Sequence, residues 1–193
     1  MTASLQKHIK KHTQISDENL EKFSNAFTLQ KVVKKEFLLK EGEICQFEGF
    51  VTGGCFKVFH SDQDGTEHTL YFAIEDWWVA DVDSFTNSKP SQLNIQALEN
   101  SEVLLISKQN KEKLYQEIPE IEKLFRIMSQ KNLVALQRRM IDNLSKTADQ
   151  RYLDFLAKYP KITQRLSNIQ IAAYLGVSPE FVSKIRRKIT KKL

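Results

Sequence analysis

The sequence predicts an α+β protein with three consecutive parts: an antiparallel β-roll or barrel, one long helix and a small helical domain. Seven short β-rich segments between Glu36 and Ser107 are separated by glycines and turn dipeptides, a pattern typical of an all-β sandwich or barrel. Residues 120–145 contain no Gly or Pro and indicate one long helix. Two capped helical segments follow Leu166. The 193 residues suffice for this arrangement.

Two short helices are expected before the β-rich part, at residues 5–13 and 17–26, where Ser16 or Asp17 can cap the second helix. Asp64-Gly65 lies between two apolar segments and is a strong signal for a tight hairpin. The segments expected as strands are 36–39, 47–52, 55–61, 66–73, 77–82, 93–97 and 102–107. Strands at this spacing favour a sandwich or barrel over a parallel sheet with crossover helices.

The long helix expected over residues 120–145 follows a shorter one at 110–117 that stops before Pro119. Its apolar residues are spread over more than one stripe, so it can pack both on its own barrel and on a second copy of the chain. Lys131 and Arg138 interrupt the heptad pattern, which argues against a regular coiled coil. A packing helix within one chain is the alternative. These apolar residues include Ile121, Leu124, Phe125, Met128, Leu133, Leu136, Met140, Ile141 and Leu144.

Basic residues are concentrated at the C-terminus. The chain has a net charge of +5 and an isoelectric point near 9.1. Residues 161–193 contain eight Lys or Arg and a single acid, Glu180. Residues 146–193 together carry +8, which leaves −3 for the first 145 residues. A weakly acidic body with a strongly basic end indicates a polyanionic partner, with a solubilising terminal face as the alternative.

The composition excludes several classes of protein. Two cysteines, Cys45 and Cys55, are too few for a disulfide scaffold, a four-cysteine zinc site or a four-cysteine iron–sulfur cluster. Free thiols are favoured over a redox pair. The apolar runs are too short for a membrane span, and residues 1–8 lack the apolar core of a signal peptide. A cytoplasmic protein without membrane association is therefore expected.

Histidines give little support for a metal site or a cofactor. His8 and His12 lie four residues apart on an expected helix, but no third ligand is evident, so a solvated helix face is favoured. His60 and His68 are too few for a metal-dependent barrel enzyme. With no catalytic constellation in the chain, neither enzymatic activity nor a cofactor is expected.

The segment from Leu166 to the C-terminus carries the most specific pattern, that of a helix-turn-helix. Ser167 and Gln170 form a capping-box arrangement that opens the first helix. Gly176 ends this helix, because glycine readily adopts a positive φ. Ser178 caps the second helix, with Pro179 at its first position. Inward-facing positions are expected at Ile171, Ala172, Leu175, Val177, Val182, Ile185 and Ile189.

The second of these helices presents a narrow, mostly cationic face opposite its apolar stripe. Such a helix fits the major groove of B-DNA, and its N-terminal side chains reach the base edges. Lysines and arginines supply attraction to phosphates. A plain helical hairpin is the alternative. The residues predicted to contact DNA are Ser178, Pro179, Glu180, Ser183, Lys184, Arg187, Lys188 and Lys191.

The combination of a small β-barrel, a long helix and a helix-turn-helix resembles the Crp/Fnr family of bacterial transcription regulators. The resemblance covers the chain from about residue 15 onward. It implies a cyclic-nucleotide-binding-like β-roll at residues 1–115, a dimerisation helix at 116–145 and a DNA-binding domain at 146–193. It also implies a homodimer on double-stranded DNA, with RNA polymerase as a further candidate partner. By the resemblance, Glu180 and Lys184 occupy base-reading positions. Pro179 stands where many members have an arginine, so the family's best-known operator is not expected.

The resemblance also locates a candidate effector pocket: Trp78, Val79, Ala80, Asp81, Ser91 and Gln92. Members that bind cyclic AMP carry a Gly-Glu pair and, some ten residues later, Arg-Ser. Here Val79-Ala80 and Ser91-Gln92 stand at those places. Asp81 can substitute for the acid with a shift of one residue, but only Lys89 lies near the place of the arginine. Because a buried phosphate needs a cationic partner, cyclic AMP is not expected to bind in the usual way.

Three interpretations of the function remain open at this point. The first is a Crp/Fnr-type regulator that responds to an unknown small-molecule effector. The second is a regulator that needs no ligand, which the missing arginine favours. The third is a sensor or interaction module of the cyclic-nucleotide-binding fold whose basic end binds no specific DNA.

Overall fold

The computed structural model describes residues 2–190, with side chains as far as Lys188. Ile189 (its side chain) and Lys191, both named above, therefore lie outside the described residues. Two four-stranded sheets form the β-roll, and every strand pairing in them is antiparallel. The first sheet has the order β1(Thr28–Val32), β8(Ser101–Ser107), β3(Phe47–Gly53), β6(Trp78–Val79). The second has the order β2(Phe37–Leu39), β7(Asn94–Ala97), β4(Phe56–Ser61), β5(Glu67–Ala73).

Alternating apolar side chains from both sheets fill the interior of the roll. Val51, Phe56, Val58 and Ile95 are fully buried in this first core. The β4–β5 hairpin predicted from Asp64-Gly65 is present, and Gly65 adopts φ +78° in its turn, a conformation that favours glycine. The expected antiparallel roll is confirmed.

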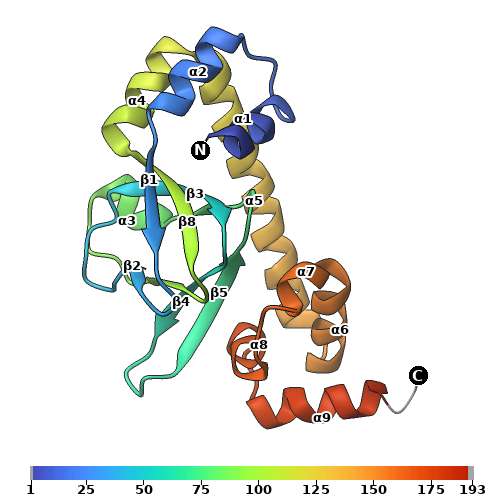
Figure 1. The fold of residues 1–193 in the computed structure, drawn as a ribbon. Helices are drawn as coiled ribbons and strands as arrows, with labels where there is room; N and C mark the ends of the chain where they lie inside the picture. Colours follow the sequence, from blue (N-terminus) through green and yellow to red (C-terminus); the bar gives the residue numbers. More distant parts are fainter. Residues whose placement is uncertain (1, 191–193) are drawn as a thin grey trace.

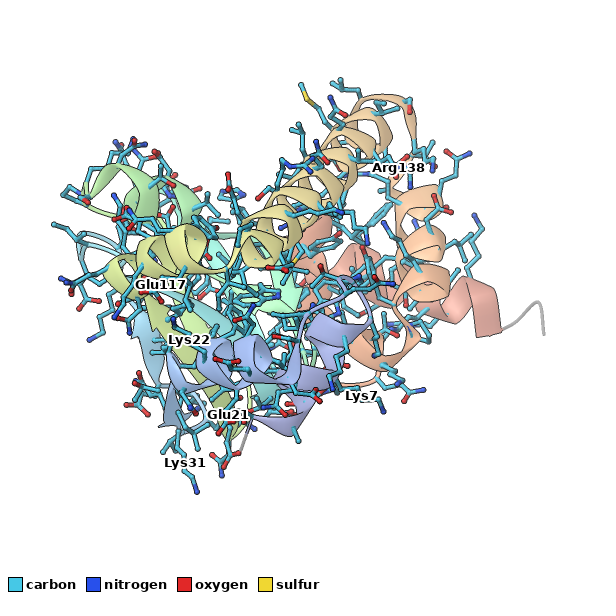
Figure 2. All side chains as sticks on the ribbon, turned by 90° about the horizontal axis from the view of Figure 1, so that it is seen from above. Lys7, Glu21, Lys22, Lys31, Glu117 and Arg138 are labelled. Atoms are coloured by element: carbon cyan, nitrogen blue, oxygen red, sulfur yellow. The ribbon has the colours of Figure 1, made fainter. Side chains whose placement is uncertain are left out.

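A second core joins the helices at one end of the roll to the long helix. The helices α1(Ala3–Lys10), α2(Asp17–Asn25) and α4(Lys108–Glu117) gather around the start of α5(Pro119–Ser145) (Figure 1). Leu5, Phe23, Phe50 and Leu124 are among its buried members. Lys22 on α2 and Glu117 on α4 form an ion pair of 2.7 Å at the surface of this group (Figure 2). The long helix predicted over residues 120–145 is thus present, beginning one residue earlier.

The last part of the chain is helical. It contains α6(Ala148–Lys158), α7(Pro160–Thr163), α8(Asn168–Leu175) and α9(Pro179–Thr190). Its apolar side chains form a third core that also includes Cys55, Phe72 and Ile74 of the roll. The helical domain therefore packs directly against the roll, and α9 lies on the side of that domain away from it (Figure 1).

The structure differs from the sequence prediction at four elements, β1, β6, α3(Val82–Asn87) and α7. The sequence does not predict β1, because this edge strand exposes most of its side chains and lacks a clear apolar alternation. The strand expected at 77–82 is only Trp78–Val79, since Asp81 caps a short helix, α3(Val82–Asn87), by accepting from the amides of Asp83 and Ser84. The short helix α7 is the third element that the sequence does not predict.

Candidate nucleic-acid interface

The turn between α8 and α9 has the geometry that the sequence predicts. The hydroxyl of Ser167 accepts from the amide of Gln170, whose side chain accepts in return from the Ser167 amide, so the capping box is complete. Gly176 ends α8 with φ +66°. The hydroxyl of Ser178 accepts from the amide of Phe181 and caps α9. One correction concerns Val177, which is half-buried rather than fully buried.

The apolar stripe of α9 anchors it to α8, and its polar face is open to solvent. Val182 and Ile185 are buried in the third core, as predicted. Among the residues predicted to contact DNA, Ser178, Glu180, Lys184, Arg187 and Lys188 are at least partly exposed, while Pro179 and Ser183 are half-buried. The helix therefore offers its cationic side chains to a partner without any rearrangement within the chain.

Two contacts hold the flanks of this face. Ser183 is not free: its hydroxyl donates to the carbonyl of Pro179 and accepts from the side-chain amide of Asn168. Lys188 lies 3.5 Å from the carboxylate of Asp149 on α6. Glu180, Lys184 and Arg187 remain as the charged residues at the centre of the described face.

The second half of α5 carries an exposed apolar stripe. Leu133, Leu136, Met140 and Leu144 follow one another at spacings of three and four residues, which places them on one face of the helix. Their exposed fractions run from 57% to 80%, whereas Ile121 and Leu124 in the first half of the same helix are fully buried. The second half of α5 therefore exposes to solvent a row of apolar side chains of the kind usually found in a protein core.

Several residues predicted to line the effector pocket form hydrogen bonds with one another and with neighbouring residues. The buried carboxylate of Asp81 accepts a 2.6 Å bond from the hydroxyl of Ser91, besides the two amides at the start of α3. The hydroxyl of Tyr71 lies 3.1 Å from the carbonyl oxygen and 3.3 Å from the amide nitrogen of Ala80. Burial raises the pKa of Tyr71 to about 12, so this hydroxyl stays protonated at neutral pH. The backbone amides around Asp81 that could hold a phosphate therefore already have acceptors within the chain.

The other residues of the predicted pocket lie apart from this pair. Val79 is buried in the core of the roll, while Trp78 points into the second core, with its ring 5.4 Å from that of Phe50. Gln92 is exposed, and its carbonyl oxygen lies 2.9 Å from Nδ1 of His60. Lys89, the nearest candidate for the missing arginine, pairs with Asp83 at the surface.

Comparisons with known proteins agree with this architecture. Residues 29–117 match the family model of the cyclic nucleotide-binding domain. The transcriptional activator protein Anr of Pseudomonas protegens is 28% identical over 176 residues, which cover 81% of this chain and 71% of Anr. Among solved structures, the c-di-GMP responsive global regulator CLP of Xanthomonas campestris superposes with a TM-score of 0.76 at 16% identity, over 92% of this chain and 93% of CLP. FixK2 of Bradyrhizobium japonicum gives 0.77 at 19% identity, over 86% and 85%.

The chain thus contains a cyclic nucleotide-binding domain at residues 29–117, and it is similar in sequence to a transcriptional activator and in fold to two further regulators. The family resemblance inferred from the sequence is therefore confirmed, as is the predicted fold class. The matched residues 29–117 comprise strands β1 to β8 and helices α3 and α4, apart from the first residue of β1.

The cysteines and histidines of the chain lie outside α9. Cys45 and Cys55 are free and buried, and burial raises the pKa of the Cys55 thiol to about 12. His8 and His12 are half-buried, with the ring of His8 against those of Phe50 and His12, so the expected solvated helix face is only partly exposed. Within residues 2–190, no three His, Cys, Asp or Glu side chains group together in a way that could hold a metal ion. No helix in this range has the length and apolarity to cross a membrane.

Sequence reasoning missed several residues that shape the site. Tyr71 is one of them, although its inward position on β5 follows from the alternation along the strand. Long-range contacts between residues 35 to 90 positions apart connect the helical domain to the roll, and no local pattern reveals them. They are made by Arg139, Arg165, Glu75 and Glu99.

Proposed function

We propose that this protein is a homodimeric DNA-binding regulator that places α9 of each subunit in successive major grooves of a near-palindromic site. The observation that carries the proposal is the exposed cationic face of α9 on a correctly capped helix-turn-helix. Side chains near the start of such a helix reach base edges, and a two-fold dimer places two of them about one helical turn apart. In this scheme Glu180 and Lys184 read bases, with Ser178, Pro179 and Ser183 beside them. Arg187 and Lys188 contact phosphates, and Lys191 would add to them.

The stripe on α5 supports the homodimer. Leu133, Leu136, Met140 and Leu144 repeat at the spacing that two packed helices require, and a second copy of the same stripe is a self-complementary cover for them. The domain division follows: a roll at residues 1–115, a dimerisation helix at 116–145 and a DNA-binding domain at 146–193.

The roll does not bind cyclic AMP in the usual way under this proposal. Asp81 and Ser91 bond to one another where an anionic phosphate would need donors, and a carboxylate there repels a second negative charge. A different small-molecule effector and direct contact with RNA polymerase are compatible with the proposal. The proposed location is the cytoplasm, and neither enzymatic activity nor a cofactor is part of the proposal.

The test is fluorescence anisotropy on labelled duplex DNA over a series of salt concentrations, without added effector. The variant Lys184→Ala with Arg187→Ala is compared with Lys123→Ala, an exposed lysine in the first half of α5. The double variant should lose affinity, and its salt slope should fall by about one for each phosphate contact removed. The Lys123 variant should bind as the wild type does. Equal binding by all three proteins would favour the interpretation as a sensor or interaction module.

A further inference from the structure

The helical domain and the roll meet at an interface, here called the seam, that contains apolar and polar contacts. The apolar part of the seam is the third core, in which Phe72 on β5 lies 5.8 Å from the ring of Tyr174 on α8 and 6.5 Å from that of Phe155 on α6. The ring of Trp77 meets that of Tyr159 edge-on at 5.7 Å. Two arginines supply the polar contacts, and they differ in how exposed they are.

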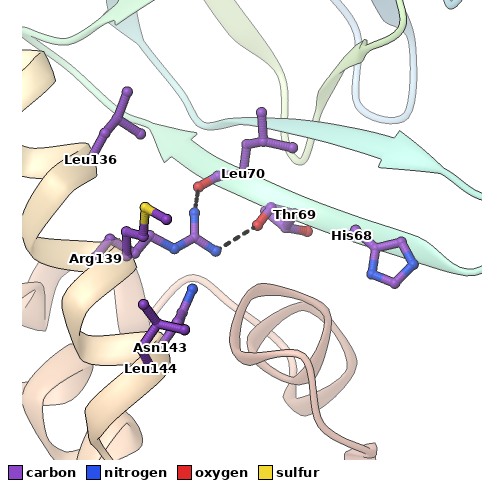
Figure 3. Close-up of a pocket in the computed structure, with 8 residues that line it drawn as sticks. His68, Thr69, Leu70, Leu136, Arg139, Asn143 and Leu144 are labelled. Atoms are coloured by element: carbon purple, nitrogen blue, oxygen red, sulfur yellow. Dashed lines mark hydrogen bonds between the residues drawn. The ribbon is translucent and has the colours of Figure 1, made fainter.

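Arg139 on α5 connects three elements through backbone carbonyls. One guanidinium nitrogen donates to the carbonyl of Thr69 (3.1 Å), and the other donates to that of Leu70 (Figure 3). The nitrogen that bonds to Thr69 also donates to the carbonyl of Tyr174 on α8 (2.9 Å). The guanidinium also lies over the Tyr174 ring, 4.2 Å from its centroid. Opening these contacts would leave a half-buried cation and several carbonyls without partners, which is costly.

Arg165, just before α8, makes a more exposed contact with two glutamates of the roll. It donates to both carboxylate oxygens of Glu75, at 2.8 and 3.2 Å, and to the carboxylate of Glu99. The exposed fractions of these side chains are 23%, 45% and 42%. Ion pairs with this exposure contribute little to stability, and salt screens them.

The segment from Glu75 to Asp81 runs from this seam into the candidate effector pocket. Glu75 and Trp77 face the helical domain, and Trp78 faces the second core. Ala80 and Asp81 then form the hydrogen bonds with Tyr71 and Ser91 described above. A short stretch of chain thus joins a contact of the DNA-binding domain to the interior of the pocket.

We propose that the Arg165–Glu75–Glu99 cluster is a releasable clamp and Arg139 a fixed pivot, which together hold the DNA-binding domain against its own roll. The chain leaves helical geometry at Lys146 (φ −105°, ψ 145°), between α5 and α6, where the Lys146 ammonium pairs with Asp142 of α5 and Asp154 of α6. Because the face of α9 is exposed in the docked arrangement, the clamp acts on the position of the recognition helix and not on access to it.

Hydrogen exchange of the full-length protein, measured without DNA, tests the clamp. Arg165→Ala is compared with Lys161→Ala, which removes an exposed cation from α7. In the Arg165 variant, amides of residues 70–78 and 166–175 should exchange about threefold to tenfold faster, with β1, β3 and β8 unchanged. In the wild type, raising the ionic strength from about 0.1 to about 1 M should speed exchange in the same segments, and in the Arg165 variant it should not.

Tryptophan emission gives an independent readout, because Trp77 and Trp78 are the two tryptophans of the chain. With Trp78→Phe as background, adding Arg165→Ala should shift the emission of Trp77 to the red. With Trp77→Phe as background, the emission of Trp78 should not move. Exchange at the seam equal to that of the wild type would overturn the proposal, and so would an increase spread evenly over the whole roll. Since no DNA is present, failure here leaves the proposed DNA binding untouched.

Discussion

The hydroxyl of Ser91 donates a 2.6 Å hydrogen bond to the buried carboxylate of Asp81. Asp81 also caps α3, and Ser91 accepts from the amide of Leu93, so one pair of side chains closes both ends of the loop that surrounds the candidate pocket. The carboxylate of Asp81, which the family resemblance allows to stand for the acid of the cyclic-AMP binders, is thus occupied by donors of the chain itself.

We predict that cyclic AMP does not stabilise the wild-type protein. A ligand that binds only the folded state raises the melting temperature by an amount set by its concentration relative to Kd, so about 1 mM nucleotide should reveal even weak binding. Differential scanning calorimetry should give the same melting temperature with and without the nucleotide. A dose-dependent rise that Ser91→Ala abolishes would show that the pocket does accept the ligand.

Asp81→Ala should destabilise the fold by about 1–2 kcal/mol, because α3 loses its N-cap and Ser91 loses its acceptor. Asp83→Ala is the matched control. Its carboxylate is exposed and pairs with Lys89 at the surface, so its removal should change little. Urea denaturation of the three proteins measures the difference, and equal losses for both variants would contradict the role given to Asp81.

Leu136→Glu combined with Met140→Glu should convert the dimer to a monomer. Two charges in the middle of the apolar stripe cannot be buried against a second copy without a large desolvation cost. Gln130→Glu, an exposed position earlier on the same helix, is the control and should leave the dimer intact. Sedimentation equilibrium distinguishes the two. A double variant that remains dimeric would show that this stripe is not the interface.

Acid should weaken the packing of α1 through His8. Burial lowers the pKa of His8, as do the charges of His12, Lys11 and Lys131, while Asp76 opposes them. Burial and the same two lysines lower the pKa of His12. The unfolded chain therefore takes up protons before the folded one as the pH falls below about 6.5, and stability present above that value is lost.

The variant His8→Leu removes one of these titrating groups and should reduce the loss. Urea unfolding at about pH 7.5 and about pH 5.5, on either side of the ordinary histidine pKa, gives the free energy of unfolding for both proteins. The difference between the two pH values should be smaller in the variant than in the wild type. An equal or larger difference in His8→Leu would assign the acid sensitivity to other groups.

Local patterns in the sequence were enough to predict the helix-turn-helix. Ser167, Gly176 and Ser178 each act within a few residues of their own position, so their roles follow from the order of residues alone. Local patterns did not predict the hydrogen bonds within the candidate pocket. Those bonds join Tyr71 to Ala80 and Ser91 to Asp81, which are separated along the chain.

Polar contacts between residues far apart in the sequence are the other part of the structure that the sequence did not predict. Nothing in the local pattern around Arg139 distinguishes it from other polar residues of the long helix, yet its guanidinium binds carbonyls of β5 and α8. Such contacts depend on how the domains dock, and that docking combines many weak apolar contacts that no single window of sequence contains.

Selection of binding sites from a random duplex library tests the central proposal most directly, because the library contains every candidate operator. The wild-type protein should enrich sequences with two inverted half-sites whose centres lie about 10–11 base pairs apart. Lys184→Ala should enrich a different or less defined half-site. Enrichment of no common sequence by the wild-type protein, with binding that unrelated DNA abolishes, would contradict the proposal and leave only electrostatic attraction to the basic end of the chain.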